Sequence, residues 1–102
     1  MKRSQKNWDL TDMVYRVLVT NHAKKNLAQL PKNVAKEICL ELKSLSFEEN
    51  PKNHVKKLKG NKNPHFYSLR VGSYRVILNI EDNVMVIHVI EAGHRSKIYR
   101  GY

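Results

Sequence analysis

The chain has 102 residues and a formal net charge of +10, from 19 Lys and Arg against 9 Asp and Glu, and it is long enough for one domain but not for two. With 41% hydrophobic residues, 4 Gly and 3 Pro, it has the composition of a globular protein, which excludes a disordered or collagen-like chain. The single Cys39 excludes an internal disulfide and a zinc site built from cysteines, and the polar start of the sequence contains neither a signal-peptide core nor a membrane span, so we expect a cytoplasmic protein.

The domain is expected to span residues 14–102, after an N-terminal extension over residues 1–13 that we expect to be mobile. The first element of the domain is predicted from Val14 to Thr20, where a short, alternating and β-branched run is typical of a strand.

Two helices are predicted next, joined at Pro31. The first covers residues 21–30, with Asn21 as its cap, and ends where Pro31 removes the next backbone amide. The second begins at Pro31, and its apolar stripe ends before Pro51. Cys39 lies within this apolar pattern, so we expect it to be buried as a small hydrophobic residue.

The sequence from residue 50 to residue 64 is rich in Lys, Asn, Pro and Gly, which predicts a loop with a short strand around residues 55–58. Three strands are predicted after it, over residues 66–71, 74–80 and 84–92. Gly72 and Ser73 are predicted to form a two-residue hairpin turn between the first two of these strands.

The order of a strand, two helices and a run of strands predicts an α+β fold, in which a small antiparallel sheet with its N-terminal strand carries the two-helix hairpin on one face. Side chains alternate along a strand. If Tyr67 and Val76 meet the helices, Arg70 and Arg75 are therefore neighbours on the opposite, concave face. Two guanidinium groups in that position repel each other unless an anion lies between them, which indicates phosphate binding.

Positive charge is concentrated in the same half of the chain. No acidic residue occurs between Pro51 and Ile80. The seven positively charged residues of this stretch are Lys52, Lys56, Lys57, Lys59, Lys62, Arg70 and Arg75. This pattern favours a nucleic acid as the target, while a face that only improves solubility and a face that binds an acidic protein are the alternatives.

Three segments of the chain resemble the RelE/ParE superfamily of toxin–antitoxin toxins, and most closely its RelE branch. They are Lys57-Leu58-Lys59-Gly60, Tyr67-Ser68-Leu69-Arg70-Val71-Gly72-Ser73-Tyr74-Arg75-Val76-Ile77, and Gly93-His94-Arg95 with Tyr99. The resemblance implies a microRNase-like fold and cleavage of mRNA in the ribosomal A site. It also implies a RelB-like antitoxin that wraps the toxin and represses their operon with it, so that operator DNA is bound only through the antitoxin.

The resemblance also implies the site residues. Arg75 and Arg95 would stabilise the scissile phosphate while the RNA 2′-hydroxyl attacks it, a reaction that requires no metal or other cofactor. Tyr99 would assist proton transfer or stack on a base, and His94, whose ring titrates near neutrality, is a second candidate for proton transfer. The residues expected to bind RNA are Lys57, Lys59, Lys62, Arg70 and Lys97.

The sequence departs from the family pattern at one place. Typical RelE nucleases carry two lysines on the strand that here contains Phe66 and Ser68, which leaves open whether the chain is catalytic. The alternatives are a ParE-like inhibitor of DNA gyrase and a non-catalytic relative that binds RNA or its antitoxin. For Arg70, an ion pair with Glu81 or Glu91 is the structural alternative to RNA binding.

Overall fold

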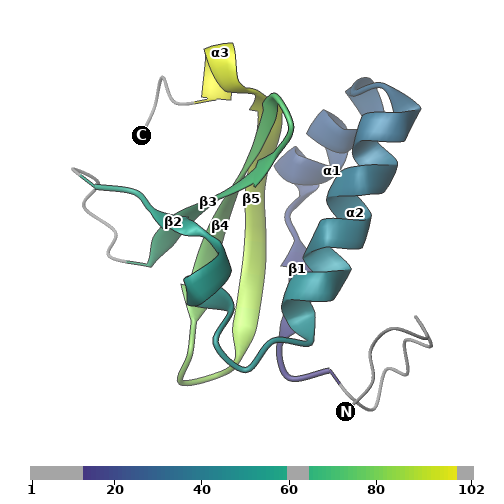
Figure 1. Cartoon of the computed structure of the whole chain (residues 1–102). Helices are drawn as coiled ribbons and strands as arrows, with labels where there is room; N and C mark the ends of the chain where they lie inside the picture. The colour runs from purple at the N-terminus through teal and green to yellow at the C-terminus, as the bar shows by residue number, and fades with distance from the viewer. Residues whose placement is uncertain (1–12, 60–64, 99–102) are drawn as a thin grey trace.

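The computed structural model describes residues 13–59 and 65–98 (Figure 1). In chain order the elements are β1 (Arg16–Val19), α1 (Asn21–Gln29), α2 (Lys32–Ser46), the short 3-10 helix η2 (Pro51–His54), β2 (Lys56–Lys57), β3 (Phe66–Val71), β4 (Tyr74–Glu81), β5 (Val86–His94) and α3 (Arg95–Ile98). The strands and the two long helices predicted from the sequence are all present, and the α+β fold is confirmed. The predicted N-terminal extension lies outside the described residues except for Met13.

The strands form one five-stranded sheet in the order β1-β5-β4-β3-β2. Strands β2 to β5 pair antiparallel with their neighbours, while β1 joins the outer edge of β5 in parallel. A parallel pair needs a long crossover connection, and here the helices and three strands lie between the two partners. The α1–α2 hairpin covers one face of the sheet (Figure 1). The other face, called the open face below, is covered at one end by α3 in the described part of the chain.

The two long helices begin and end where capping chemistry allows. Thr20 caps α1, since its Oγ1 accepts a hydrogen bond of 3.1 Å from the backbone amide of Ala23, so the predicted cap at Asn21 is wrong by one residue. The Pro31 carbonyl accepts the first hydrogen bonds of α2. In the described ranges of the chain, no helix is both long enough and apolar enough to cross a membrane.

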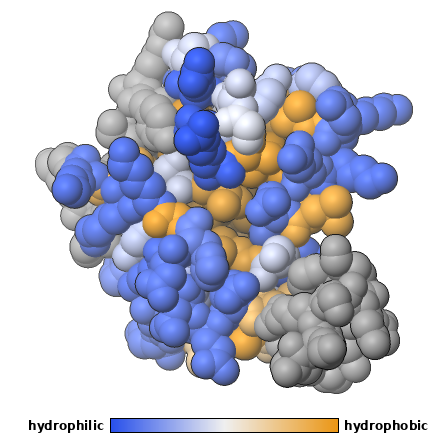
Figure 2. Space-filling model, viewed as in Figure 1, coloured by the Kyte–Doolittle hydropathy of each residue, from blue (hydrophilic) through white to orange (hydrophobic). Residues whose placement is uncertain are grey.

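The hydrophobic core lies between the sheet and α2. Its main contributors there are Ile38, Leu42, Leu45, Tyr67, Leu69, Val76 and Leu78. The prediction that Tyr67 and Val76 face the helices is therefore confirmed. Cys39 is exposed, and its predicted burial is wrong because one residue after Ile38 the helix has turned by about 100° away from the inward stripe. Hydrophobic residues show at the surface mainly along the seam between the sheet and the helices (Figure 2).

A β-bulge interrupts the pairing of β4 with β5. Leu78 pairs with Val89 and Ile77 pairs with Glu91, so Ile90 is an extra residue without a partner on β4. An extra residue reverses the alternation of side chains beyond it. As a result Glu91 shares the face of Ile77, and Gly93, rather than Ala92, shares the face of Arg75.

The β3–β4 hairpin turns at Gly72 and Ser73, as predicted. Gly72 has a φ of 58°, a left-handed conformation that glycine adopts without the steric penalty of a side chain. This turn places Arg70 and Arg75 directly opposite each other.

A polar network fastens η2 to the rest of the fold. The Tyr15 hydroxyl donates a hydrogen bond of 2.7 Å to Asp82 Oδ1, and Lys52 Nζ lies 2.9 Å from Asp82 Oδ2. The ammonium of Lys52 also lies 5.5 Å from the centre of the Tyr67 ring. Burial and the hydrogen bond to Asp82 raise the pKa of Tyr15 to about 12, while the hydrogen bonds from Lys52 and Tyr15 lower the pKa of Asp82.

Candidate nucleic-acid interface

Arg70 and Arg75 form a pair of guanidinium groups on the open face. They are direct cross-strand partners on β3 and β4, and directly opposed residues lie about 5 Å apart at Cβ. The Nη1 atom of Arg75 donates hydrogen bonds of 2.9 Å each to the carbonyls of Gly72 and Tyr74. These bonds fix the half-buried Arg75 against its own hairpin turn, so that the guanidinium is oriented before any ligand binds.

Carboxylates do not neutralise this pair. Among the described residues, Glu91 lies beside His22, Asp82 beside Lys52 and Glu48 beside His54, and no ion pair joins a carboxylate to Arg70, Arg75 or Arg95. The pairing of Arg70 with Glu81 or Glu91, which the sequence left open, is not formed. Uncompensated, adjacent positive charges attract anions, and phosphate fits two guanidinium groups well.

A groove of about 750 Å³ leads from the arginine pair along β2. Its polar and charged walls include Lys56, Lys57, Lys59, Ser68, Arg70 and Arg75, and no acidic residue lines it in the part of the chain that the structure describes. A basic channel of this kind concentrates a polyanion at its surface.

The lysines of this groove take different directions because neighbouring residues of β2 point to opposite faces. Lys56 is the partner of Ser68, so it lies on the open face, although the sequence analysis did not select it as an RNA-binding residue. Lys57 is the partner of Tyr67, and its Nζ lies 5.5 Å from the centre of that ring. Lys59 is exposed and lines the groove. The predicted Lys62 lies outside the described residues.

The backbone of Arg95 is bonded to the hairpin turn, at the same end of the sheet as Arg75. Its amide donates a hydrogen bond of 2.9 Å to the carbonyl of Ser73, in the hairpin turn that precedes Arg75 by two residues. Its side chain is exposed, as is that of Lys97 on α3. The predicted Tyr99 lies outside the described residues.

His94 is not brought beside the arginine pair. It is the partner of Tyr74, which packs against the core on the helix-covered side, and the two rings meet edge to face with centroids 5.4 Å apart. The Nδ1 atom of His94 accepts a hydrogen bond of 3.1 Å from the Ser96 amide and lies 2.9 Å from Ser96 Oγ. The His94 ring therefore stabilises the first turn of α3. The ring itself lies on the face of the sheet opposite Arg75.

Comparisons with known proteins agree with this geometry. Residues 17–99 match the model of the ParE toxin of the type II toxin–antitoxin system parDE. The chain belongs to this toxin family. No curated protein matches it in sequence.

Solved structures place the toxin in the RelE branch of the superfamily. It is 30% identical to a chain of the archaeal RelE–RelB complex from Pyrococcus horikoshii, covering 83% of this chain and 99% of that one, with a TM-score of 0.68. It is 26% identical to a chain of the RelBE2 toxin–antitoxin complex from Mycobacterium tuberculosis, covering 79% and 98%, with a TM-score of 0.66. The isolated RelE toxin of E. coli is 27% identical, covering 83% and 90%, with a TM-score of 0.64. The predicted family is thus confirmed.

At its C-terminal side the toxin folds α3 onto the open face. Ile98 is 3% exposed, and its Cδ1 would lie 3.5 Å from a Cβ atom placed on Gly93. Gly93 is the partner of Arg75. A side chain at position 93 would be in ordinary contact with Ile98, so Ile98 packs on the open face beside Arg75.

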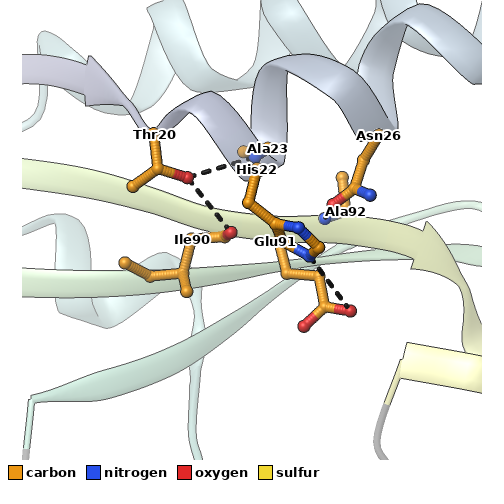
Figure 3. A network of polar contacts seen from close by, with 7 residues as sticks. All are labelled: Thr20, His22, Ala23, Asn26, Ile90, Glu91 and Ala92. Atoms are coloured by element: carbon orange, nitrogen blue, oxygen red, sulfur yellow. Dashed lines mark hydrogen bonds and ion pairs between the residues drawn. The ribbon is translucent and has the colours of Figure 1, made fainter.

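Side chains of α1 hold the edge of β5 beyond the last residue of β1 (Figure 3). Thr20 Oγ1 donates a hydrogen bond of 3.2 Å to the Ile90 carbonyl, and Asn26 Oδ1 accepts one of 3.1 Å from the Ala92 amide. His22 Nε2 lies 3.8 Å from Glu91 Oε2. Sequence reasoning considered Glu91 only as a partner for Arg70, because neither the bulge nor this edge can be read from residue spacing.

The toxin offers no assembled metal site among residues 13–59 and 65–98, since no group of three or more His, Cys, Asp or Glu side chains is placed to hold an ion there.

Proposed function

We propose that the toxin is an endoribonuclease that cleaves mRNA in the ribosomal A site, by attack of the RNA 2′-hydroxyl on the adjacent phosphate. The observation that carries this proposal is the opposed pair of Arg70 and Arg75 on the open face, without a carboxylate partner. Such a pair binds a phosphodiester, and a fixed guanidinium stabilises the additional negative charge that develops on phosphorus in the transition state.

The groove beside the pair supports a long anionic ligand. Its lysines lie along β2, so that several phosphates of one strand can bind at once. In this proposal Arg70, Lys57, Lys59 and Lys97 bind the RNA backbone, and Lys56 joins them because it faces the groove from the open side. Arg75 and Arg95 act on the scissile phosphate. A proton-transfer role for Tyr99 stays a prediction, while the contacts of His94 favour a structural role in α3.

We also propose a RelB-like antitoxin as the partner that neutralises the toxin. The related chains from P. horikoshii and M. tuberculosis were solved as RelE–RelB and RelBE2 complexes. The net charge of +10 favours an acidic segment in such a partner. In this arrangement operator DNA is bound through the antitoxin.

The nuclease proposal is tested by adding purified toxin to a translating extract and mapping the 5′ ends of the message. We expect new ends at codons occupied by ribosomes, and none when initiation is blocked beforehand. A defined message with a 2′-deoxynucleotide at the cleaved position should stay intact there, because the attacking hydroxyl is missing. Message that stays intact in the translating extract contradicts the proposal.

A second candidate function is inhibition of DNA gyrase. Two observations favour it: the matching family model describes the ParE toxin, and Phe66 and Ser68 stand where typical RelE nucleases carry lysines. Purified gyrase should then lose supercoiling activity when toxin is added, and the message in the translating extract should stay whole. Unchanged supercoiling rejects this candidate.

A further inference from the structure

The β-bulge of β5 turns a carboxylate onto the basic open face. Without the extra residue Ile90, the alternation that puts Val86 and His88 on this face would continue to position 90, and Glu91 would point toward the helices. With the bulge, Glu91 is the partner of Ile77 and lies on the open face. Bulges commonly re-aim a side chain next to an active site.

Glu91 lies one row away from the arginine pair. The direct partner of Arg75 is Gly93, and Glu91 precedes Gly93 by two residues on the same face. Diagonal neighbours of this kind are about 7–8 Å apart, a distance that long side chains bridge. A phosphodiester held by Arg75 would therefore lie within reach of the Glu91 carboxylate.

The imidazole of His22 lies beside this carboxylate, with its Nε2 3.8 Å from Oε2. The imidazole belongs to α1, on the helix-covered side, and reaches past the edge of β5 to Glu91 (Figure 3). The carboxylate is 31% exposed and the imidazole 63% exposed, so solvent and substrate both have access. Thr20 donates a hydrogen bond to the Ile90 carbonyl and Asn26 accepts one from the Ala92 amide, and these bonds fix the strand on either side of Glu91.

We propose that Glu91 is the general base of the RNA cleavage, an inference that rests on the proposed nuclease function. The reaction needs a group that accepts the proton of the 2′-hydroxyl. His94 lies on the other face, Phe66 and Ser68 carry no basic group, and His88, on the open face, lies opposite Asn79, one row farther from Arg75 than Glu91. Glu91 carries a carboxylate on the face where the substrate phosphate binds, one row from the arginine pair.

In the proposed step the Glu91 carboxylate takes the proton of the 2′-hydroxyl, and the 2′ oxygen forms a bond to the adjacent phosphorus. The bond from phosphorus to the 5′ oxygen breaks, and the leaving oxygen takes a proton from water. The products are a 2′,3′-cyclic phosphate and a 5′-hydroxyl end. The protonated Glu91 then gives its proton to the hydroxide that remains. His22 is a positioning residue, which acts by orienting the carboxylate.

The test measures single-turnover cleavage of a defined message on programmed ribosomes, with full-length protein. Glu91→Gln keeps the size of the side chain and removes the base, so kcat should fall by about 10²- to 10⁴-fold. KM for the programmed ribosome and the thermal unfolding midpoint should not change. Glu37→Gln, on the exposed side of α2, removes the same charge and should cleave at the wild-type rate.

Two further variants separate a base from a structural carboxylate. Glu91→Ala leaves a space that formate can enter, and added formate should restore part of its rate but none of the rate lost in Arg75→Ala. His22→Ala should lower kcat by up to about tenfold by loosening the carboxylate. His22→Gln, which keeps a hydrogen-bond donor, should recover most of that loss.

The outcomes distinguish the two proposals. Wild-type toxin that leaves the message intact overturns the nuclease function and this assignment with it. Wild-type cleavage together with a full rate in Glu91→Gln overturns the assignment alone. A slow Glu91→Gln with an unchanged KM, and formate rescue of Glu91→Ala, support Glu91 as the base. The assignment is also overturned if Glu91→Gln is slow but has a lowered unfolding midpoint, and formate does not rescue Glu91→Ala. Glu91 would then be a structural residue.

Discussion

Two regions of the toxin carry positive charge, and they differ in what balances it. Lys52 lies 2.9 Å from Asp82, within a network that includes the Tyr15 hydroxyl. Arg70 and Arg75 face each other on the open face without any such carboxylate among the described residues. A cation that has its anion inside the fold stabilises the fold. A cation pair left without one is available to a ligand, at the expense of mutual repulsion.

The strongest test of this comparison removes one cation from each of the two regions. Arg75→Ala should lower the rate of RNA cleavage by about 10²- to 10³-fold, since one preorganised donor to the phosphate is lost. Arg75→Lys keeps the charge but loses the two-nitrogen geometry, so it should recover only part of the rate. The rates are measured on programmed ribosomes under single-turnover conditions.

Lys52→Ala is the matched variant, because it also removes one positive charge, but from the cation that is paired with Asp82. It should lower stability while the cleavage rate per folded molecule stays at the wild-type level. A loss of rate in Lys52→Ala as large as that in Arg75→Ala would show that net charge, rather than the arrangement of the arginines, governs the activity.

The next effect concerns the turn that orients Arg75. Gly72→Ala forces a side chain into a backbone with a φ of 58°, which should lower the free energy of unfolding by about 1–2 kcal/mol. The Gly72 carbonyl also accepts a hydrogen bond from Arg75 Nη1, so the cleavage rate should fall too. Urea unfolding gives the first quantity, and Ser73→Ala, in the same turn without a positive φ, is the control.

The stability that the network of Tyr15, Lys52 and Asp82 contributes should depend on pH in two separate ranges. Hydrogen bonds lower the pKa of Asp82, so its contribution to stability is present above the unfolded value of about 3.9 and is lost as pH falls through the folded value. The pKa of Tyr15 is raised to about 12, so its contribution is complete below about pH 10 and is lost as pH rises toward 12.

Asp82→Asn should therefore abolish the acid-side loss, and Tyr15→Phe should reduce the alkaline-side loss. Both partners of the Lys52–Asp82 pair are partly exposed, so water weakens the interaction, and we expect Asp82→Asn to lower the free energy of unfolding by only about 1 kcal/mol at neutral pH. Urea unfolding across the pH range measures these changes, and an acid-side loss that persists in Asp82→Asn would contradict them.

The sequence predicted the fold well because strong periodic signals carry it. The apolar stripe of α2, the alternation along β3 and the glycine at position 72 are local features, and each has its expected place in the structure. The arginine pair was also predictable, since a two-residue turn fixes which residues are opposed.

The rest of the site depends on features that have no local signal. Because Ile90 is an extra residue in β5, Glu91 and Gly93, rather than Ile90 and Ala92, lie on the same face of the sheet as Arg75. The direction of His94 follows from the same shift, which is why reading the Gly-His-Arg segment as a unit did not show that its ring lies on the other face. The edge partner of β5 comes from the first residues of the domain, and neither its position nor its parallel direction is encoded near β5.

The smallest expected effect separates two adjacent lysines of β2. Lys56 shares the open face with Ser68, while Lys57 lies over the Tyr67 ring. If the open face binds the RNA backbone, Lys56→Ala should reduce the slope of log affinity against log salt concentration by about 0.7, the value for one phosphate contact on a single strand. Lys57→Ala should change that slope less and should instead lower stability slightly, because a cation–π contact is lost. Titrating a labelled single-stranded RNA at several salt concentrations measures both slopes. Equal slopes for the two variants would mean that Lys57 contacts an RNA phosphate as fully as Lys56 does, despite its position over the Tyr67 ring.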